Sequence, residues 1–225
     1  ESPHTAQADT DRIQPFQLES SRLRGRLARL GPTIDEIIRR HDYPEPVAHL
    51  LAESLTLTVL LASSLKYQGV FSLQLKGDGP IPFVICDVTS DNELRGYASI
   101  DDESRERLAA LSAGASPREL LGQGHLAFTV DQAGRDERYQ GIVELSGTSL
   151  SECVRHYFHQ SEQLDTGLQL EASRGAGGWG ASALLLQRTP AGQDAEPEAA
   201  TASSDESDDW RRAMMLMETA TAEEL

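Results

Sequence analysis

Cys153, His156 and His159 are the residues whose side chains and spacing most readily suggest a chemical role. They follow one another at three-residue steps within a predicted helix, and thiolates and imidazoles are ligands of zinc. Their directions spread over roughly a third of the helix circumference, however, and a structural zinc site usually takes four ligands. We therefore interpret them as a packed cysteine beside two surface histidines, and expect this chain to bind no metal.

His41–Asp42 and Asp78 could instead take part in acid–base or phosphate chemistry. Sequence neighbours such as His41 and Asp42 do not face one another, so capping or turn hydrogen bonds are the better interpretation. Asp78 lies between two glycines in LQLKGDGP (73–80), but a phosphate-binding loop needs GxxxxGK[ST] opening a helix. We predict that Asp78–Gly79 forms a hairpin turn with positive backbone angles and binds no nucleotide.

Cys86 and Cys153 are the only two cysteines, and both lie in apolar segments. Burial would raise their thiol pKa values and suppress their reactivity. Two isolated cysteines also fit a reducing cytoplasm better than a disulfide-rich secreted protein. The sequence contains no nucleophile elbow, HExxH, dinucleotide fingerprint or CxxC pair, so we assign no catalytic and no cofactor-binding residues.

Composition narrows the classes of partner. The 225 residues are 39% hydrophobic and carry 20 basic against 36 acidic side chains, a formal charge of −16, which disfavours nucleic acid. The apolar stretch VAHLLAESLTLTVLLASSL contains His49, Glu53 and several hydroxyls, which predicts a buried helix and no membrane span. The N-terminal residues lack the features of a signal peptide.

Several segments have the period of a strand or a helix. Capping boxes at Thr33/Glu36 and Ser149/Glu152 predict two helices, and Pro46 opens a long helix to about Leu65. Glycines in RGAGGWG predict a flexible connection between the last two strands. Alternating apolar residues predict strands at 22–30, 71–75, 82–88, 93–100, 125–131, 138–145, 168–173 and 181–188.

The ends of the chain differ in composition from the middle. We predict a disordered tail over residues 1–15, a core domain over 16–189 and a flexible acidic linker over 190–208. Residues 209–225 read as the start of a helical region in which Trp210, Met214 and Met217 recur at helical spacing.

Five segments together resemble the heat-shock-protein-33 family of redox-regulated chaperones: HDYPEPV (41–47), LKYQGVFSLQLKGDGP (65–80), LRGYA (94–98), ERYQGIVEL (137–145) and YFHQSEQL (157–164). The resemblance runs from Phe16 to Leu225. It implies an α+β fold in which a strongly twisted, largely antiparallel sheet carries helices. It also implies a cytoplasmic, ATP-independent holdase that binds unfolding proteins and commonly dimerises with exchanged elements.

The resemblance also implies a switch that this sequence lacks. In the family, a C-terminal module with CxC and CxxC motifs holds zinc when reduced and forms disulfides when oxidised. Zinc is therefore expected in the full-length protein, through cysteines not present here, and this chain is expected to stop within the helical linker. We take Trp210, Met214 and Met217 as candidate client-binding residues.

Two alternatives of other classes stay open. One is an enzyme in which loop residues such as Asp78 or His41 converge in a cleft that no linear motif reveals. The other is a scaffold that recognises one fixed partner through the Trp210 helix.

Overall fold

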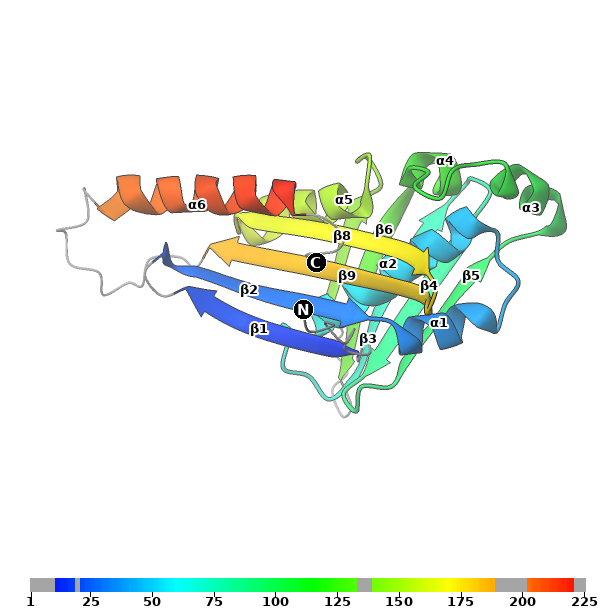
Figure 1. Cartoon of the computed structure of the whole chain (residues 1–225), viewed down its shortest axis with the longest axis horizontal. Coiled ribbons are helices and arrows are strands. Elements are labelled where there is room, and N and C mark those ends of the chain that lie inside the picture. The colour runs from blue at the N-terminus through cyan, green and yellow to red at the C-terminus, as the bar shows by residue number, and fades with distance from the viewer. Residues whose placement is uncertain (1–10, 19–20, 133–138, 189–201, 221–225) are drawn as a thin grey trace, which may run out of the picture.

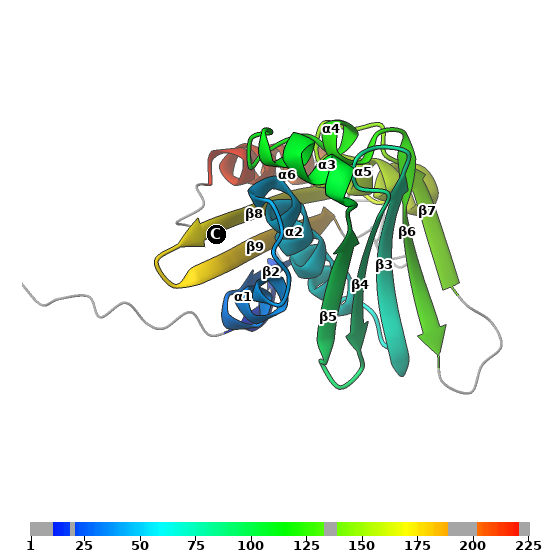
Figure 2. The same cartoon turned by 90° about the vertical axis from the view of Figure 1, so that its right-hand side faces the viewer.

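The strands form two antiparallel sheets on either side of one long helix (Figures 1 and 2). The computed structural model describes residues 11–18, 21–132, 139–188 and 202–220. The first sheet has the order β1-β2-β9-β8, with β1 (Arg12–Leu18), β2 (Leu23–Leu30), β8 (Thr166–Gly175) and β9 (Gly178–Arg188). The second has the order β5-β4-β3-β6-β7, with β3 (Gly69–Gly77), β4 (Phe83–Thr89), β5 (Leu94–Ser99), β6 (Gly124–Gln132) and β7 (Tyr139–Glu144).

Helix α2 (Glu45–Ala62) lies between the two sheets and contributes to the core of both (Figure 2). It has the length and hydropathy of a membrane-spanning helix, but 83% of it is buried inside the fold, as in a core helix. Its hydroxyls donate to carbonyl oxygens one turn earlier, Ser54 to Leu50 at 2.7 Å and Thr58 to Ser54 at 2.6 Å. The helix can therefore be buried on all sides without leaving these polar groups unsatisfied.

Shorter helices cover the ends and edges of the sheets. In Figure 2, α3 and α4 lie across the end of α2, and α5 and α6 lie beside β8 in Figure 1. These helices are α1 (Pro32–Arg39), α3 (Asp102–Ala109), α4 (Pro117–Leu121), α5 (Leu150–Tyr157), which continues as the π-helix η2 (Phe158–Glu162), and α6 (Ala202–Thr219). Two sheets and their helices confirm the predicted α+β class.

Neither predicted capping box is complete, because the Glu152 carboxylate accepts from the Thr148 N–H at 2.7 Å and does not reach back to the Ser149 N–H. Ser149 caps α5 by accepting a hydrogen bond from the Glu152 N–H at 3.2 Å. Thr33 does not cap α1, because the helix begins at Pro32 and Thr33 lies inside its first turn. The Asp11 carboxylate accepts from the Gly31 N–H at 2.7 Å and the Thr33 N–H at 3.1 Å instead. A side chain 20 residues earlier therefore satisfies this helix terminus, which no local pattern indicates.

Both predicted glycine turns join antiparallel strands, but their geometry differs from the expectation. The prediction of positive backbone angles at Asp78 and Gly79 is wrong, because neither residue is among those with a positive φ. Residues 78–82 form the loop, and the Asp78 carboxylate accepts from the Gln123 N–H at 2.7 Å. The prediction of a flexible connection in RGAGGWG is also wrong. β8 pairs with β9 up to Gly175 and Gly178, which leaves a two-residue turn.

The boundaries of the core shift at both ends. β1 begins at Arg12, so the last residues of the predicted tail 1–15 form an edge strand paired with β2. α6 begins at Ala202, so the end of the predicted linker 190–208 is helical. Residues 1–10, 189–201 and 221–225, which contain the rest of the tail and linker, lie outside the described residues.

Candidate functional site

Helix α6 turns its predicted apolar face toward the body of the protein. Met217 is 6% exposed, and Trp210 and Met214 are half-buried. On the opposite side of the same helix, Met215 is 52% exposed and Leu216 is 71% exposed. The structure therefore brings the three sequence-predicted residues together on one covered face, as their helical spacing indicates.

A glycine in β8 makes room for this face. A Cβ atom added to Gly167 would lie 2.5 Å from Met214 Cε and 2.7 Å from Met217 Cε, closer than real Cβ contacts. The two methionine side chains therefore lie directly against the strand backbone. Because methionine is flexible and adaptable, this contact can form and be lost without demanding one exact fit.

Two long-range hydrogen bonds hold α6, one near its middle and one just beyond its C-terminus. Near the middle of the helix, the Ser21 hydroxyl donates to the Asp209 carboxylate at 2.7 Å. Beyond its C-terminus, the Gln169 side-chain N–H donates to the Ala220 carbonyl at 3.0 Å. Both partners of α6 belong to the first sheet or to the β1–β2 connection. The helix is thus fastened at two points along the edge of this sheet.

The face of the first sheet that α6 contacts carries a group of apolar side chains, with Gln14, Gln169 and Arg188 in the same cross-strand rows. The strand register places Gly167 in one cross-strand row with Leu186, Gly25 and Phe16. The Phe16 ring covers Gly25, since a Cβ there would lie 2.2 Å from its Cζ atom. We call this surface the sheet platform, defined by the apolar side chains Phe16, Leu18, Leu23, Leu27, Leu184 and Leu186. Within it, Leu18 is 49% exposed, while Leu23 and Leu186 are buried.

A groove of about 690 Å³ runs between α5, β8 and α6, and we call it the α6 groove. Met214 and Trp210 line one side, and Leu168 and Leu170 of β8 line another. Its charged lining residues have both signs, namely Glu53, Glu152, Arg155, Asp165 and Glu218. The groove thus combines adaptable apolar walls with a polar rim.

Glu53 of α2 is the most perturbed acid of this groove. Burial, with a smaller contribution from the charge of Glu171, raises its pKa to about 7. Burial likewise lowers the pKa of His49, one turn earlier on α2. Near neutral pH, a carboxyl group at the base of the α6 groove is therefore poised between its charged and neutral forms.

The other chemistry candidates do not converge. His156 and His159 line the α6 groove, whereas Cys153 is 1% exposed and packed in the core. Among the described residues, no group of three or more His, Cys, Asp or Glu side chains could hold a metal ion. Cys86 and Cys153 are both free and buried, and burial raises the pKa of each thiol. The two buried cysteines lack the four-ligand set of a structural zinc site.

His41 and Asp42 are engaged separately. The His41 ring lies 5.0 Å from the Tyr43 ring and 5.5 Å from the Tyr97 ring, centroid to centroid. Asp42 interacts with Arg105 of α3 through both its carboxylate and its backbone carbonyl. With Asp78 bonded to Gln123, none of these residues forms the cleft that the enzyme alternative requires.

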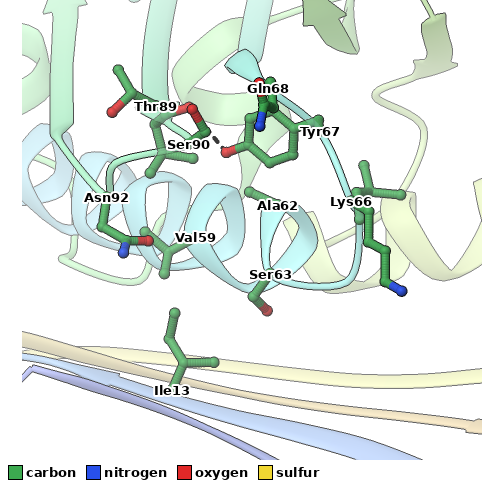
Figure 3. A pocket seen from close by; sticks show the side chains of 12 residues that line it. Ile13, Val59, Ala62, Ser63, Lys66, Tyr67, Gln68, Thr89, Ser90 and Asn92 are labelled. Atoms are coloured by element: carbon green, nitrogen blue, oxygen red, sulfur yellow. Dashed lines mark hydrogen bonds between the residues drawn. The ribbon is translucent and has the colours of Figure 1, made fainter. Parts of the chain in front are cut away.

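Another cavity, of about 660 Å³, lies between β1, the end of α2 and the β4–β5 connection (Figure 3). The Tyr67 hydroxyl donates to the Val88 carbonyl at 3.2 Å and forms part of its wall. Hydroxyl and amide side chains such as Ser63, Gln68 and Asn92 supply most of its polarity, and Lys66 supplies a charge. This mixture offers no nucleophile paired with a base.

Comparison with known proteins decides the family. The profile of the family described as Hsp33 protein matches residues 11–225. The chain belongs to the Hsp33 family. Proteins named 33 kDa chaperonin are similar to it throughout: that of Caulobacter vibrioides is 40% identical over 231 residues, covering 100% of this chain and 72% of the relative. That of Azotobacter vinelandii is 41% identical over 218 residues, covering 97% and 68%.

A solved Hsp33 structure supports the fold. The crystal structure of the 33 kDa chaperonin (heat shock protein 33 homolog) from Thermotoga maritima superposes with a TM-score of 0.64 at 21% identity. The match covers 78% of this chain and 60% of that one. The predicted family and fold class are confirmed, and the chain is thereby placed among chaperones.

Sequence reasoning found the α6 residues but missed what they contact. No local sequence pattern indicates the roles of Gly167, Gln169 and Ser21, because each contacts a partner distant in sequence. Part of the sheet platform could be predicted, because Leu23 and Leu27 alternate with arginines along β2. This strand pairs with β1 on one side and β9 on the other. Glu53 was noted only as an interruption of an apolar helix, and its place at the groove depends on tertiary packing.

Proposed function

We propose that this chain contains the client-binding surface of a redox-regulated, ATP-independent holdase. It would bind unfolding or oxidatively damaged proteins and prevent their irreversible aggregation. The observation that carries the proposal is that the apolar face of α6 rests on the β8 edge of the sheet platform. Binding exposed apolar segments needs such a surface and no catalytic group, so we propose no enzymatic activity.

The contact of α6 suits a cover that can be displaced. Met214 and Met217 pack on Gly167, and two hydrogen bonds fasten the helix, one near its middle and one just beyond its C-terminus. Segments with few buried contacts open at a lower free energy than the core of a protein. Opening of α6 would expose its own apolar side chains and the β8 backbone around Gly167, at the edge of the sheet platform, and unfolded clients could contact both.

The regulation is proposed to lie outside these residues. We propose that the full-length protein is cytoplasmic and holds zinc through cysteines that this chain does not contain. In the normally reducing cytoplasm these cysteines stay reduced, and their oxidation under stress releases α6. We further propose that two copies can exchange α6, so that each platform is covered by the partner copy's helix. The partners are unfolded proteins and a second copy, not nucleic acid or membrane.

Light scattering from a heat-denatured client enzyme tests the proposal, with and without a thiol reductant. Suppression of scattering in both conditions is expected, because no redox cysteine pair is available in this chain to restrain the surface. Suppression only after oxidation would give Cys86 or Cys153 a switching role. Absence of suppression in both would favour the scaffold with one fixed partner.

Variants of α6 then define the role of the helix. Met214→Ala with Met217→Ala is expected to strengthen suppression, because it loosens the cover over the platform. Met215→Ala with Leu216→Ala is the matched control, since these side chains are exposed on the same helix. Weaker suppression by the first pair would show that Met214 and Met217 themselves bind clients, and Trp210→Ala would test Trp210 in the same way. Equal effects of both pairs would argue against a cover.

A further inference from the structure

A cavity of about 430 Å³ opens between the two sheets at the end of α2, and we call it the aromatic pocket. Its walls come from both sheets, from α2 and from the α5–η2 segment. The lining is mostly apolar and includes Phe71, Phe128, Tyr157 and Phe158. Of the residues that the structure describes, none lines both this pocket and the α6 groove. The pocket is therefore a separate feature that the proposed client-binding surface does not use.

The aromatic walls hold one another in place. The rings of Phe71 and Phe128 are stacked with centroids 6.5 Å apart, and Tyr157 meets Phe128 edge-on at 4.6 Å. Gly141 of β7 permits this arrangement, because a Cβ there would lie 2.3 Å from Phe128 Cε2 and 2.7 Å from the Tyr157 hydroxyl. Phe158 adds an edge-on contact with Tyr157 at 5.7 Å. The pocket is thus pre-formed, as small-molecule sites usually are.

Glu162 is the one carboxylate among the described residues of the lining, and it is already hydrogen-bonded. Glu162, at the end of η2, accepts from the Tyr139 hydroxyl at 2.6 Å and from the Tyr157 hydroxyl at 3.0 Å. Burial is the largest cause that raises the pKa of Tyr157, and hydrogen bonding to Tyr139 and Glu162 raises it further. The Tyr157 hydroxyl therefore stays a neutral donor. Glu162 is therefore occupied by groups of the protein itself.

The cations of the lining have donors to spare. Arg24 donates to the Gln187 side-chain oxygen at 3.1 Å, which uses one of its five N–H groups. Lys66 forms no ion pair with any described residue. A smaller adjoining cavity of about 90 Å³ shares Arg24, Ser64 and Gln187 and adds Arg26. Positive charge thus gathers at one pocket of a protein whose formal charge is −16.

We propose that the aromatic pocket binds a monomeric amphiphilic anion. The apolar chain or ring lies among Phe71, Phe128 and Phe158, and the anionic head group lies beside Arg24 and Lys66. The pocket volume falls within the range of drug-sized ligand sites, and apolar walls with a few placed polar groups are typical of them. Each methylene buried in the pocket should tighten binding by about fourfold until the pocket is full.

Calorimetric titration with straight-chain carboxylates below their micellar concentration tests this proposal. Binding should tighten from hexanoate to octanoate to decanoate, and decanoate should bind more tightly than decanol or decylamine. Equal binding of decanol and decanoate would overturn the proposal by showing a purely apolar void. Tighter binding of decylamine would overturn it as well, because Glu162 would then be the group that selects the ligand.

Charge-neutralising variants locate the head group. Lys66→Gln and Arg24→Gln should each weaken decanoate binding by about threefold to tenfold, as expected for one charge-assisted contact, and leave decanol binding unchanged. Lys76→Gln is the matched control, because this exposed cation lies over Phe83 on another surface. An equal loss in the control would contradict the site, since the effect would then come from net charge. Circular dichroism verifies that the variants fold.

Two further measurements separate this pocket from other sites. Met217→Ala should leave decanoate affinity unchanged, and a loss would place the ligand in the α6 groove. Leu164→Trp, which adds bulk to the pocket wall, should abolish binding, and unchanged binding would contradict the assigned location. Vesicles of phosphatidylglycerol should not sediment the protein. Sedimentation that Lys66→Gln abolishes would assign the cations to a membrane surface and overturn the monomeric ligand.

Discussion

Asp35 of α1 accepts a hydrogen bond from the backbone N–H of Trp179 at 2.9 Å, across 144 positions of sequence. Its second oxygen pairs with Arg39 Nε at 2.7 Å. Asp35 is 8% exposed, and it lies beside Gly178, which has a φ of +106°. One buried carboxylate therefore satisfies the tight turn between β8 and β9 and fixes α1 on the first sheet.

Asp35→Ala should lower the free energy of unfolding by about 1–3 kcal/mol, because the Trp179 N–H would be left buried without an acceptor. Asp35→Asn should cost less, since it keeps an acceptor oxygen and loses only the ion pair with the exposed Arg39. Urea denaturation measures both. Equal losses would mean that the ion pair, and not the hydrogen bond, carries the effect.

Glu53→Gln should change the pH dependence of stability. Burial raises the Glu53 pKa from 4.5 to about 7, so the folded chain holds a proton that the unfolded chain has released between these values. The free energy of unfolding therefore falls as pH rises through this window. Glu53→Gln should stabilise the protein at pH 8 by up to about 3 kcal/mol and have little effect at pH 4.

Urea denaturation at pH 4, 6 and 8 would show this difference. Glu106→Gln, at an exposed position of α3, is the control and should leave the pH profile unchanged. A constant difference between Glu53→Gln and the wild type at all three pH values would contradict the burial of an ionisable group at the groove.

The two thiols should react slowly in the folded protein. Cys86 is 0% exposed and Cys153 is 1% exposed, and burial raises both pKa values, so little thiolate is available. Ellman's reagent at pH 8 should detect both thiols rapidly only after urea is added. Rapid reaction of either thiol without urea would show that its segment opens easily, and would restore it as a candidate redox switch.

Gly167→Ala should loosen α6, because the added methyl group collides with Met214 and Met217. Faster hydrogen exchange of the α6 amides is the expected readout. Gly175→Ala, in the same strand with no atom within 4 Å of the added carbon, is the matched control. Met214→Ala should partly rescue Gly167→Ala, and an absence of coupling between the two changes would argue that α6 does not rest on this glycine.

The elements that could be predicted are those whose signal is local. Alternation placed β2 to β9 but not β1, most of which fell in the predicted tail. The Ser149 cap placed α5, because a side chain there bonds a backbone group three residues on. Helix α3 was missed although Asp101 caps it, since its residues are largely charged and show no apolar period. The helical spacing of Trp210, Met214 and Met217 predicted a face, but not the sheet that covers it.

What could not be predicted depends on partners distant in sequence. Asp11 caps α1, Asp35 holds Trp179, and Glu162 meets two tyrosines from other elements. Three of the segments that carry the family resemblance, 65–80, 137–145 and 157–164, meet at the aromatic pocket. Their residues are unremarkable one by one, and only the pairing of β3, β6 and β7 brings them into one cavity.

Sharing α2 between two sheets has a consequence for how the protein withstands heat. Neither sheet can melt alone, because losing either one would expose the same apolar helix to water. The body should therefore unfold in a single cooperative step, while α6, fastened at its edge, can come away and return. On heating, such a protein should loosen its outer helix before α2 and the two sheets unfold together.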